Sequence, residues 1–227
     1  MSGMDSHIEW PTAEIATLFA AGLIQRGDRV LDMGCGLGTE AIQLGVLGCD
    51  VVAIDKEGKP PEGEEKQIDG AQRRLDKQRR AVQRRVDFIE ADARTFREGE
   101  ASTFHVVIDR LLLHNRGEGA QCRIVRGAAY AIAAGGIYVV RCRRDRAGEP
   151  PDPRWAAEVL HAESTIEPGA RDLLDAYFDV GPEVPFAGLI TDPTQATEGM
   201  VVRAMPMSLI VAVRNDRRFG RPKSDRP

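Results

Sequence analysis

Three glycines at alternate positions, Gly34, Gly36 and Gly38, separate a short apolar run from a helical pattern. The run at residues 30–33 ends in these glycines as a buried strand does, and residues 40–47 have the spacing of a helix. Glycine permits a sharp backbone turn and a close approach to a ligand at positions where a side chain would collide. The segment therefore predicts a strand, a ligand-binding loop and a helix in succession.

The acidic residues around this loop indicate which ligand it binds. The next buried run ends in Asp55, and a carboxylate there can accept hydrogen bonds from both hydroxyls of a ribose. The dinucleotide fingerprint G-x-G-x-x-G has its third glycine one residue later, where this chain has Thr39. Asp32, just before the loop, would repel a pyrophosphate but suits a ligand with an ammonium group. The pattern favours a nucleoside ligand and disfavours a nicotinamide dinucleotide.

Short Val/Ile-rich runs alternate with helical patterns along the whole chain, which is typical of a parallel sheet covered on both faces. We expect strands at residues 30–33, 51–54, 86–89, 104–108, 137–141 and 207–213, and helices from residue 12 and at 40–47, 64–85, 119–133, 154–163 and 170–177. One domain over residues 1–213 and a basic, disordered tail over 214–227 are predicted. The tail holds six Lys or Arg and two Asp.

The segment at residues 30–39, Val-Leu-Asp-Met-Gly-Cys-Gly-Leu-Gly-Thr, resembles the first motif of class I S-adenosylmethionine (SAM) dependent methyltransferases. Later motifs of that superfamily are similar, in order, to residues 53–55, 90–93, 104–114 and 134–136. The resemblance covers about residues 10–142, and 207–213 fits the last strand. The Asp109-Arg110 pair looks most like the small-molecule branch near tellurite-resistance and thiopurine methyltransferases. This resemblance implies an α/β, Rossmann-like, doubly wound sheet of seven mostly parallel strands, with helices on both faces and an antiparallel last strand.

The resemblance also implies a role for individual residues. The methionine end of SAM would meet Asp32 and the loop residues Gly34, Cys35, Gly36 and Gly38. The ribose would be held by Asp55, with Lys56 beside it, and the adenine would lie between Asp92 and Ala93. The rim under the sulfonium and the incoming nucleophile would be formed by Asp109 and Arg110, with His114 as a candidate general base.

Each of these residues also has a plain structural interpretation. The glycine loop could be a tight turn without a ligand, and Asp55 could cap a helix. Asp92 could be a turn acid ahead of Thr95. Asp109 and Arg110 could form a surface ion pair, and His114 could be a capping or loop histidine.

Composition narrows the class of partner. The chain has 227 residues and a net charge of −4, and without the +4 of its tail the body carries −8, which disfavours a long nucleic-acid partner. Seven basic residues between 73 and 85 spread around a helix and are expected to be a solvated face. The longest apolar stretch, residues 128–140, is too short to span a bilayer. The N-terminus has no secretion-signal pattern and the four cysteines have no metal-site spacing, so we expect a cytoplasmic, metal-free monomer or homodimer.

The sequence thus predicts an enzyme that moves a methyl group from SAM to an O, S or N atom of a small molecule by in-line displacement, leaving S-adenosylhomocysteine. Two alternatives stay open: an RNA or protein methyltransferase that uses the Arg-rich helix, and a non-catalytic SAM-binding regulatory subunit. The Pro/Gly/Thr-rich stretch at residues 184–197 is expected to help cover the acceptor site.

Overall fold

A computed structural model describes residues 12–56, 66–96, 103–110, 112–113, 117–143, 166–191 and 202–215. Strands alternate with helices, as expected. The strands are β1 Arg29–Met33, β2 Asp50–Asp55, β3 Val86–Glu90, β4 Phe104–Arg110, β5 Ile132–Arg143, β6 Phe178–Val180, β7 Val184–Thr191 and β8 Val202–Arg214. The helices are α1 Ala13–Ala20, α2 Thr39–Leu47, α3 Gln67–Asp76, α4 Arg80–Gln83, α5 Glu118–Ala131 and α7 Pro168–Tyr177.

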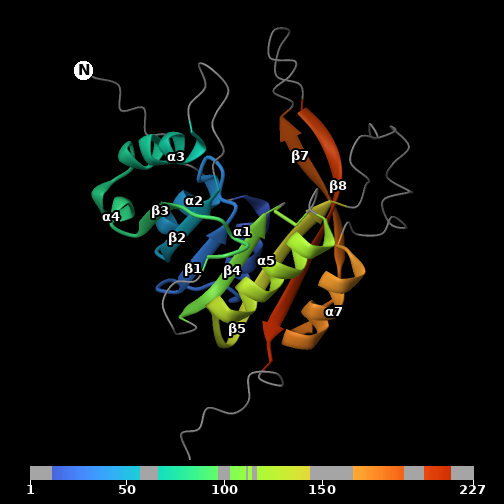
Figure 1. Cartoon of the computed structure of the whole chain (residues 1–227). Coiled ribbons are helices and arrows are strands. Elements are labelled where there is room, and N and C mark those ends of the chain that lie inside the picture. Colours follow the sequence, from blue (N-terminus) through green and yellow to red (C-terminus); the bar gives the residue numbers. More distant parts are fainter. Residues whose placement is uncertain are drawn as a thin grey trace, which may run out of the picture.

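The strands form one sheet in the order β3-β2-β1-β4-β5-β8-β6, with β7 paired to β8 (Figure 1). The first five strands are parallel and β8 runs antiparallel to β5. Phe178 of β6 lies opposite Arg214, and Val184 of β7 lies opposite Leu209, so the β6–β7 chain advances six residues where β8 advances five. One extra residue is a β-bulge, so β7 continues β6 along the same edge. The expected seven-stranded sheet with an antiparallel last strand is confirmed.

Two apolar cores cover the two faces of the sheet. On one face, α5 and α7 lie side by side and bury residues such as Ile124 and Leu174 (Figure 1). On the other face, α1 and α2 bury Ile15 and Ile42. The amide of Ile15 donates to the Thr12 side chain, which caps α1 at its N-terminus.

Several expected boundaries are wrong. The single helix expected over residues 64–85 is two helices, α3 and α4. At the break between them, the side-chain amide of Gln83 donates to the carbonyls of Asp76 and Gln78. The helix expected to reach residue 133 ends at Ala131, and the expected turn at 134–136 is a bulge inside β5. There β5 advances from Ile132 to Ile137 while β4 advances two residues. The helix expected at 154–163 lies outside the described residues.

The last strand extends past the domain boundary expected after residue 213. β8 starts at Val202 and ends at Arg214, whose guanidinium is buried and donates to the Ile132 carbonyl. The amide of the buried Asn215 donates to the Tyr177 carbonyl at 2.9 Å. These two residues belong to the folded domain, and the rest of the predicted tail, 216–227, lies outside the described residues.

Candidate functional site

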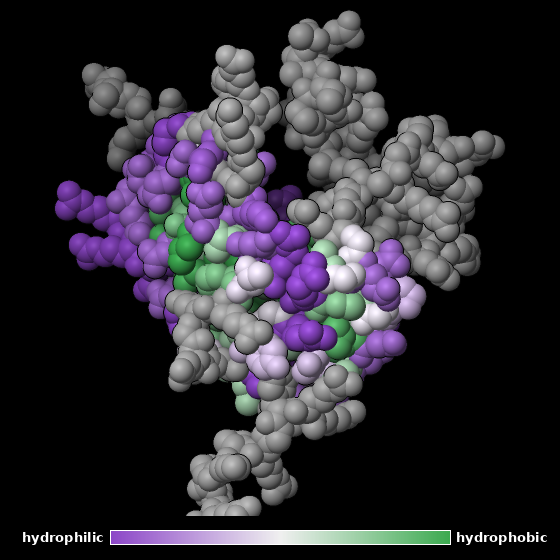
Figure 2. All heavy atoms as spheres, viewed as in Figure 1, coloured by the Kyte–Doolittle hydropathy of each residue, from purple (hydrophilic) through white to green (hydrophobic). Residues whose placement is uncertain are grey.

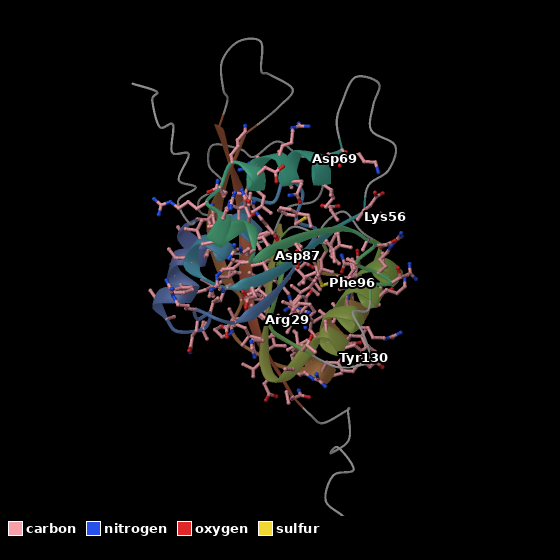
Figure 3. All side chains as sticks on the ribbon, turned by 90° about the vertical axis from the view of Figure 1, so that its left-hand side faces the viewer. Arg29, Lys56, Asp69, Asp87, Phe96 and Tyr130 are labelled. Atoms are coloured by element: carbon pink, nitrogen blue, oxygen red, sulfur yellow. The ribbon has the colours of Figure 1, made fainter. Side chains whose placement is uncertain are left out.

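The carboxyl ends of the parallel strands surround a pocket at one edge of the sheet, where a doubly wound sheet binds its ligands. Loops that follow β1, β2, β3 and β4 all contribute to it. The lining consists of Gly34, Asp55, Lys56, Ala91, Asp92, Ala93, Arg94, Leu112 and Ile124. Figure 3 shows Lys56 near this end of the molecule and Arg29, at the start of β1, near the opposite end. Five residues expected to bind a cofactor therefore lie together in one pocket.

The glycine loop folds back onto the end of β2. The amide of Gly36 donates to Oδ2 of Asp55 at 2.7 Å, and the amides of Gly34 and Cys35 donate to the Ile54 carbonyl. All three alternate glycines have positive φ, and a Cβ added to Gly38 would lie 2.4 Å from the Phe88 ring. A side chain at Gly38 is therefore excluded by both conformation and space. Cys35 is buried, and its thiol donates to the Gly36 carbonyl of the loop at 3.8 Å.

Asp55 lines the pocket while it stabilises the loop. The first helix after it, α3, has Lys66 at its N-cap, so Asp55 does not cap this helix. Its hydrogen bond with Gly36 engages Oδ2. Because a carboxylate has about four acceptor positions, Asp55 retains the capacity to accept from ribose hydroxyls.

Asp92 is held by two cations at the pocket wall. Lys56 Nζ lies 2.9 Å from its Oδ2, and Arg94 Nε donates to its Oδ1 at 2.9 Å. The hydrogen bonds of Arg94, and then that of Lys56, keep the pKa of Asp92 well below its usual range. The Asp92 carbonyl also accepts from the Thr95 amide, so Asp92 belongs to a turn as well as to the pocket wall, and its contact with the adenine stays a prediction. Arg94 was missed, although its position two residues after a site acid gave a signal for it.

Asp32 is a buried acid without a hydrogen-bond partner on one oxygen. It is 1% exposed, and within the described residues nothing donates to its Oδ2. Burial, and then the nearby Glu40, raise the pKa of Asp32 well above its usual value. A buried carboxylate of this kind is costly unless a cation or a donor reaches it. The site beside the glycine loop thus suits an ammonium group.

Asp109 and Arg110 are not brought together. Neighbouring residues of a strand face opposite sides of the sheet. Asp109 is fully buried, whereas Arg110 Nη1 donates to Glu40 at the start of α2, at 2.6 Å. Asp109 accepts from Leu112 and Tyr138 inside the fold, so the two residues are not a surface ion pair with each other, and contact of Asp109 with cofactor and acceptor stays a prediction. His114 lies outside the described residues.

The described residues include neither a membrane-spanning helix nor a metal-binding cluster. They contain no helix with the length and apolar character needed to cross a membrane. They also contain no group of three or more His, Cys, Asp or Glu residues arranged to hold a metal ion.

The architecture is similar to that of several solved structures. No family model and no curated protein sequence matches the chain. Among solved structures, one described as the conversion of a disulfide bond into a thioacetal group during echinomycin biosynthesis is similar, with a TM-score of 0.65, 23% identity and coverage of 92% of this chain and 84% of that one. A SAM-dependent methyltransferase from Methanosarcina mazei has a TM-score of 0.59 at 16% identity, over 86% of this chain and 95% of its own.

The magnesium protoporphyrin IX methyltransferase of Synechocystis, solved with bound SAM, has a TM-score of 0.56 at 21% identity, over 89% of this chain and 77% of its own. The chain has the class I SAM-dependent methyltransferase fold. This methyltransferase fold agrees with the motif order read from the sequence and with a pocket at the carboxyl ends of β1–β4. A fold does not by itself assign a reaction, so the activity is argued from the site.

Proposed function

We propose that this protein is a SAM-dependent methyltransferase that acts on a small molecule. The observation that carries the proposal is a pocket at the strand ends lined by Asp55 and Asp92, together with a buried acid, Asp32, beside a glycine loop. SAM combines a ribose, an adenine and an ammonium group. A pyrophosphate beside the glycine loop would instead lie against the buried acid Asp32, which disfavours a nicotinamide cofactor.

Each residue then has a defined task. Asp55 accepts from the ribose hydroxyls, Ala93 and Ile124 provide apolar contacts for the adenine, and Asp32 faces the methionine ammonium. When bound, SAM supplies a methyl group activated by a positive sulfur. The chain needs to hold the acceptor in line with that methyl group and to exclude water, and such alignment can contribute about 7–11 kcal/mol.

A small acceptor is supported by the negative net charge of the body and by the basic residues between 73 and 85, some of which are already paired within the protein. Figure 2 shows hydrophilic side chains gathered over α3 and α4. Two of these basic residues are already engaged, because Arg74 donates to the Leu37 carbonyl and to Thr39, and Arg85 pairs with Asp50. The acidic body further disfavours RNA. The Synechocystis neighbour is named for a small acceptor, magnesium protoporphyrin IX, which is consistent with this class.

The test is production of S-adenosylhomocysteine from SAM with a panel of thiols, phenols, carboxylates and amines. We expect turnover with one class, lost in Asp55→Ala. Turnover on RNA or protein alone would favour the first alternative. SAM binding without turnover on any acceptor would favour a regulatory subunit. The acceptor atom, the cytoplasmic location and the oligomeric state remain predictions.

A further inference from the structure

A buried carboxylate and a buried phenol lie behind the pocket wall. Asp109 and Tyr138 are both fully buried, and the Tyr138 hydroxyl donates to Oδ2 of Asp109 at 3.1 Å. The amide of Leu112 donates to Oδ1 of the same carboxylate at 2.9 Å. Asp109 therefore links β5 to the loop that follows β4.

That loop forms one wall of the pocket. Leu112 lines the pocket, and its Cδ1 lies 3.2 Å from where a Cβ on Gly34 would be, so it packs against the glycine loop. The next residue, Leu113, is fully buried, and its carbonyl accepts from the Gln121 side chain of α5 at 3.0 Å. Gln121 also accepts from the Glu167 amide, just before α7. The wall is thus held from β5 on one side and from α5 on the other.

We propose that Asp109 and Tyr138 are positioning residues, which fix Leu112 against the cofactor through the ionised carboxylate, so that SAM affinity falls as Asp109 takes up a proton. This inference rests on the proposed function. It replaces the expected contact of Asp109 with the reacting atoms by an action through the loop.

The sign of the pH dependence follows from the geometry. Burial raises the pKa of Asp109 to about 7, while hydrogen bonds from Leu112, Tyr138 and Leu113 hold it down. The ionised carboxylate accepts all of these donors, whereas a protonated one gives up part of its acceptor capacity. The hold on Leu112 therefore weakens as pH falls through about 7.

The other titratable groups around Asp109 are few among the described residues. Burial, and then Asp109, raise the pKa of Tyr138 well above its usual value, so its hydroxyl stays a donor. Cys142, on the same strand, acts on Tyr138 in the same direction. Asp32 of β1 is coupled to Asp109 as a like charge. Arg110 follows Asp109 in β4 and faces the other side of the sheet. From α5, the facing polar group is the Gln121 amide, which does not titrate.

The test is calorimetric titration of SAM into wild-type protein and Tyr138→Phe between pH 5.5 and 8.5. The quantities measured are the dissociation constant for SAM and the pH midpoint of its change. Removing one donor to the carboxylate should move the midpoint up by about one pH unit and weaken binding at pH 7 about three- to tenfold. The matched control is Tyr130→Phe, an exposed tyrosine at the far end of α5 (Figure 3), which should leave both quantities unchanged.

An unchanged midpoint and affinity in folded Tyr138→Phe would overturn the inference. If that variant does not fold, hydrogen exchange of the Leu112 amide in the wild type answers the same question. Its protection factor should be lower at pH 6 than at pH 8, and equal protection would overturn the inference. Absence of SAM binding by the wild type at every pH would instead contradict the proposed function, and the exchange measurement would still test the positioning role.

Discussion

At the scale of single residues, the charge state of Asp32 connects the fold to its ligand. The carboxyl group is buried, one of its oxygens has no donor among the described residues, and burial raises its pKa. An ammonium group at Asp32 favours the ionised form. SAM binding should therefore release a proton, and affinity should rise with pH until the free protein is ionised at Asp32.

Asp32→Asn should weaken SAM binding at least about tenfold and reduce this proton release to the share that comes from Asp109, since a neutral amide neither ionises nor pairs with ammonium. Calorimetry in two buffers of different ionisation enthalpy measures both quantities. Asp50→Asn is the control, because Asp50 is an exposed acid at the opposite end of the sheet, paired with Arg85. Wild-type affinity and proton release in Asp32→Asn would contradict this role.

Individual site residues could be predicted from sequence where they adjoin a recognisable strand end. Asp55 and Asp92 lie in the pocket for that reason. Ile124 could not be found this way, because it reaches the pocket only through packing of α5 on the sheet. A common rim position for Asp109 and Arg110 could have been excluded from the sequence, since strand alternation directs neighbouring residues to opposite faces.

At the scale of elements, the turn from β1 into α2 depends on a residue without a side chain. Gly38 has a φ of +72°, and a Cβ there would overlap the Phe88 ring of β3. Backbone strain and steric overlap both oppose substitution, and relief of the overlap would require the Phe88 ring to shift, with Ala71 of α3 also in contact. The loop, and with it the wall formed by Gly34 and the Gly36–Asp55 hydrogen bond, is therefore set by this position.

Gly38→Ala should lower the free energy of unfolding by at least about 2 kcal/mol. Gly119→Ala is the matched control: this glycine is exposed in α5 and a Cβ there has no neighbour closer than 3.9 Å. The control should be neutral or stabilising by up to about 1 kcal/mol. Urea denaturation measures both, and equal effects of the two substitutions would show that the loop geometry is not limiting.

Element boundaries were the least predictable part of the fold. Neither Gly nor Pro marks the break between α3 and α4, where Gln83 bonds to the carbonyls that the ended helix leaves free. Pro185 and Gly188 suggested a loop, yet β7 is an edge strand, where a missing amide hydrogen bond is tolerated. In both places tertiary contacts outweigh the local signal.

At the scale of the whole molecule, the order of the strands places the pocket at the ends of β1–β4 and a projecting two-stranded ribbon, formed by β7 and the first part of β8, beyond β5. Arg143, at the end of β5, pairs with Met207, so β8 from Val202 to Pro206 extends past the carboxyl end of β5 together with β7 (Figure 1). This is the edge of the sheet on which the pocket lies. The location is consistent with our expectation that residues 184–197 help cover the acceptor.

The pairing of Thr191 with Val202 allows this role to be tested. Replacing residues 192–201 by Asn-Gly, which suits a two-residue hairpin, should shorten the connection between β7 and β8 without breaking their register. We expect acceptor turnover to fall at least about tenfold, as alignment is lost, while SAM affinity stays within about twofold. Unchanged kcat/KM for the acceptor in this variant would exclude residues 192–201 from the acceptor site.

The central claim, that the pocket at the glycine loop binds SAM, is tested most directly by calorimetric titration of the wild type and Asp55→Ala with SAM, S-adenosylhomocysteine and NADH. We predict micromolar binding of both adenosyl compounds by the wild type, none by Asp55→Ala, and no binding of NADH. Folded wild-type protein that binds neither adenosyl compound, or that binds NADH in their place, would contradict it.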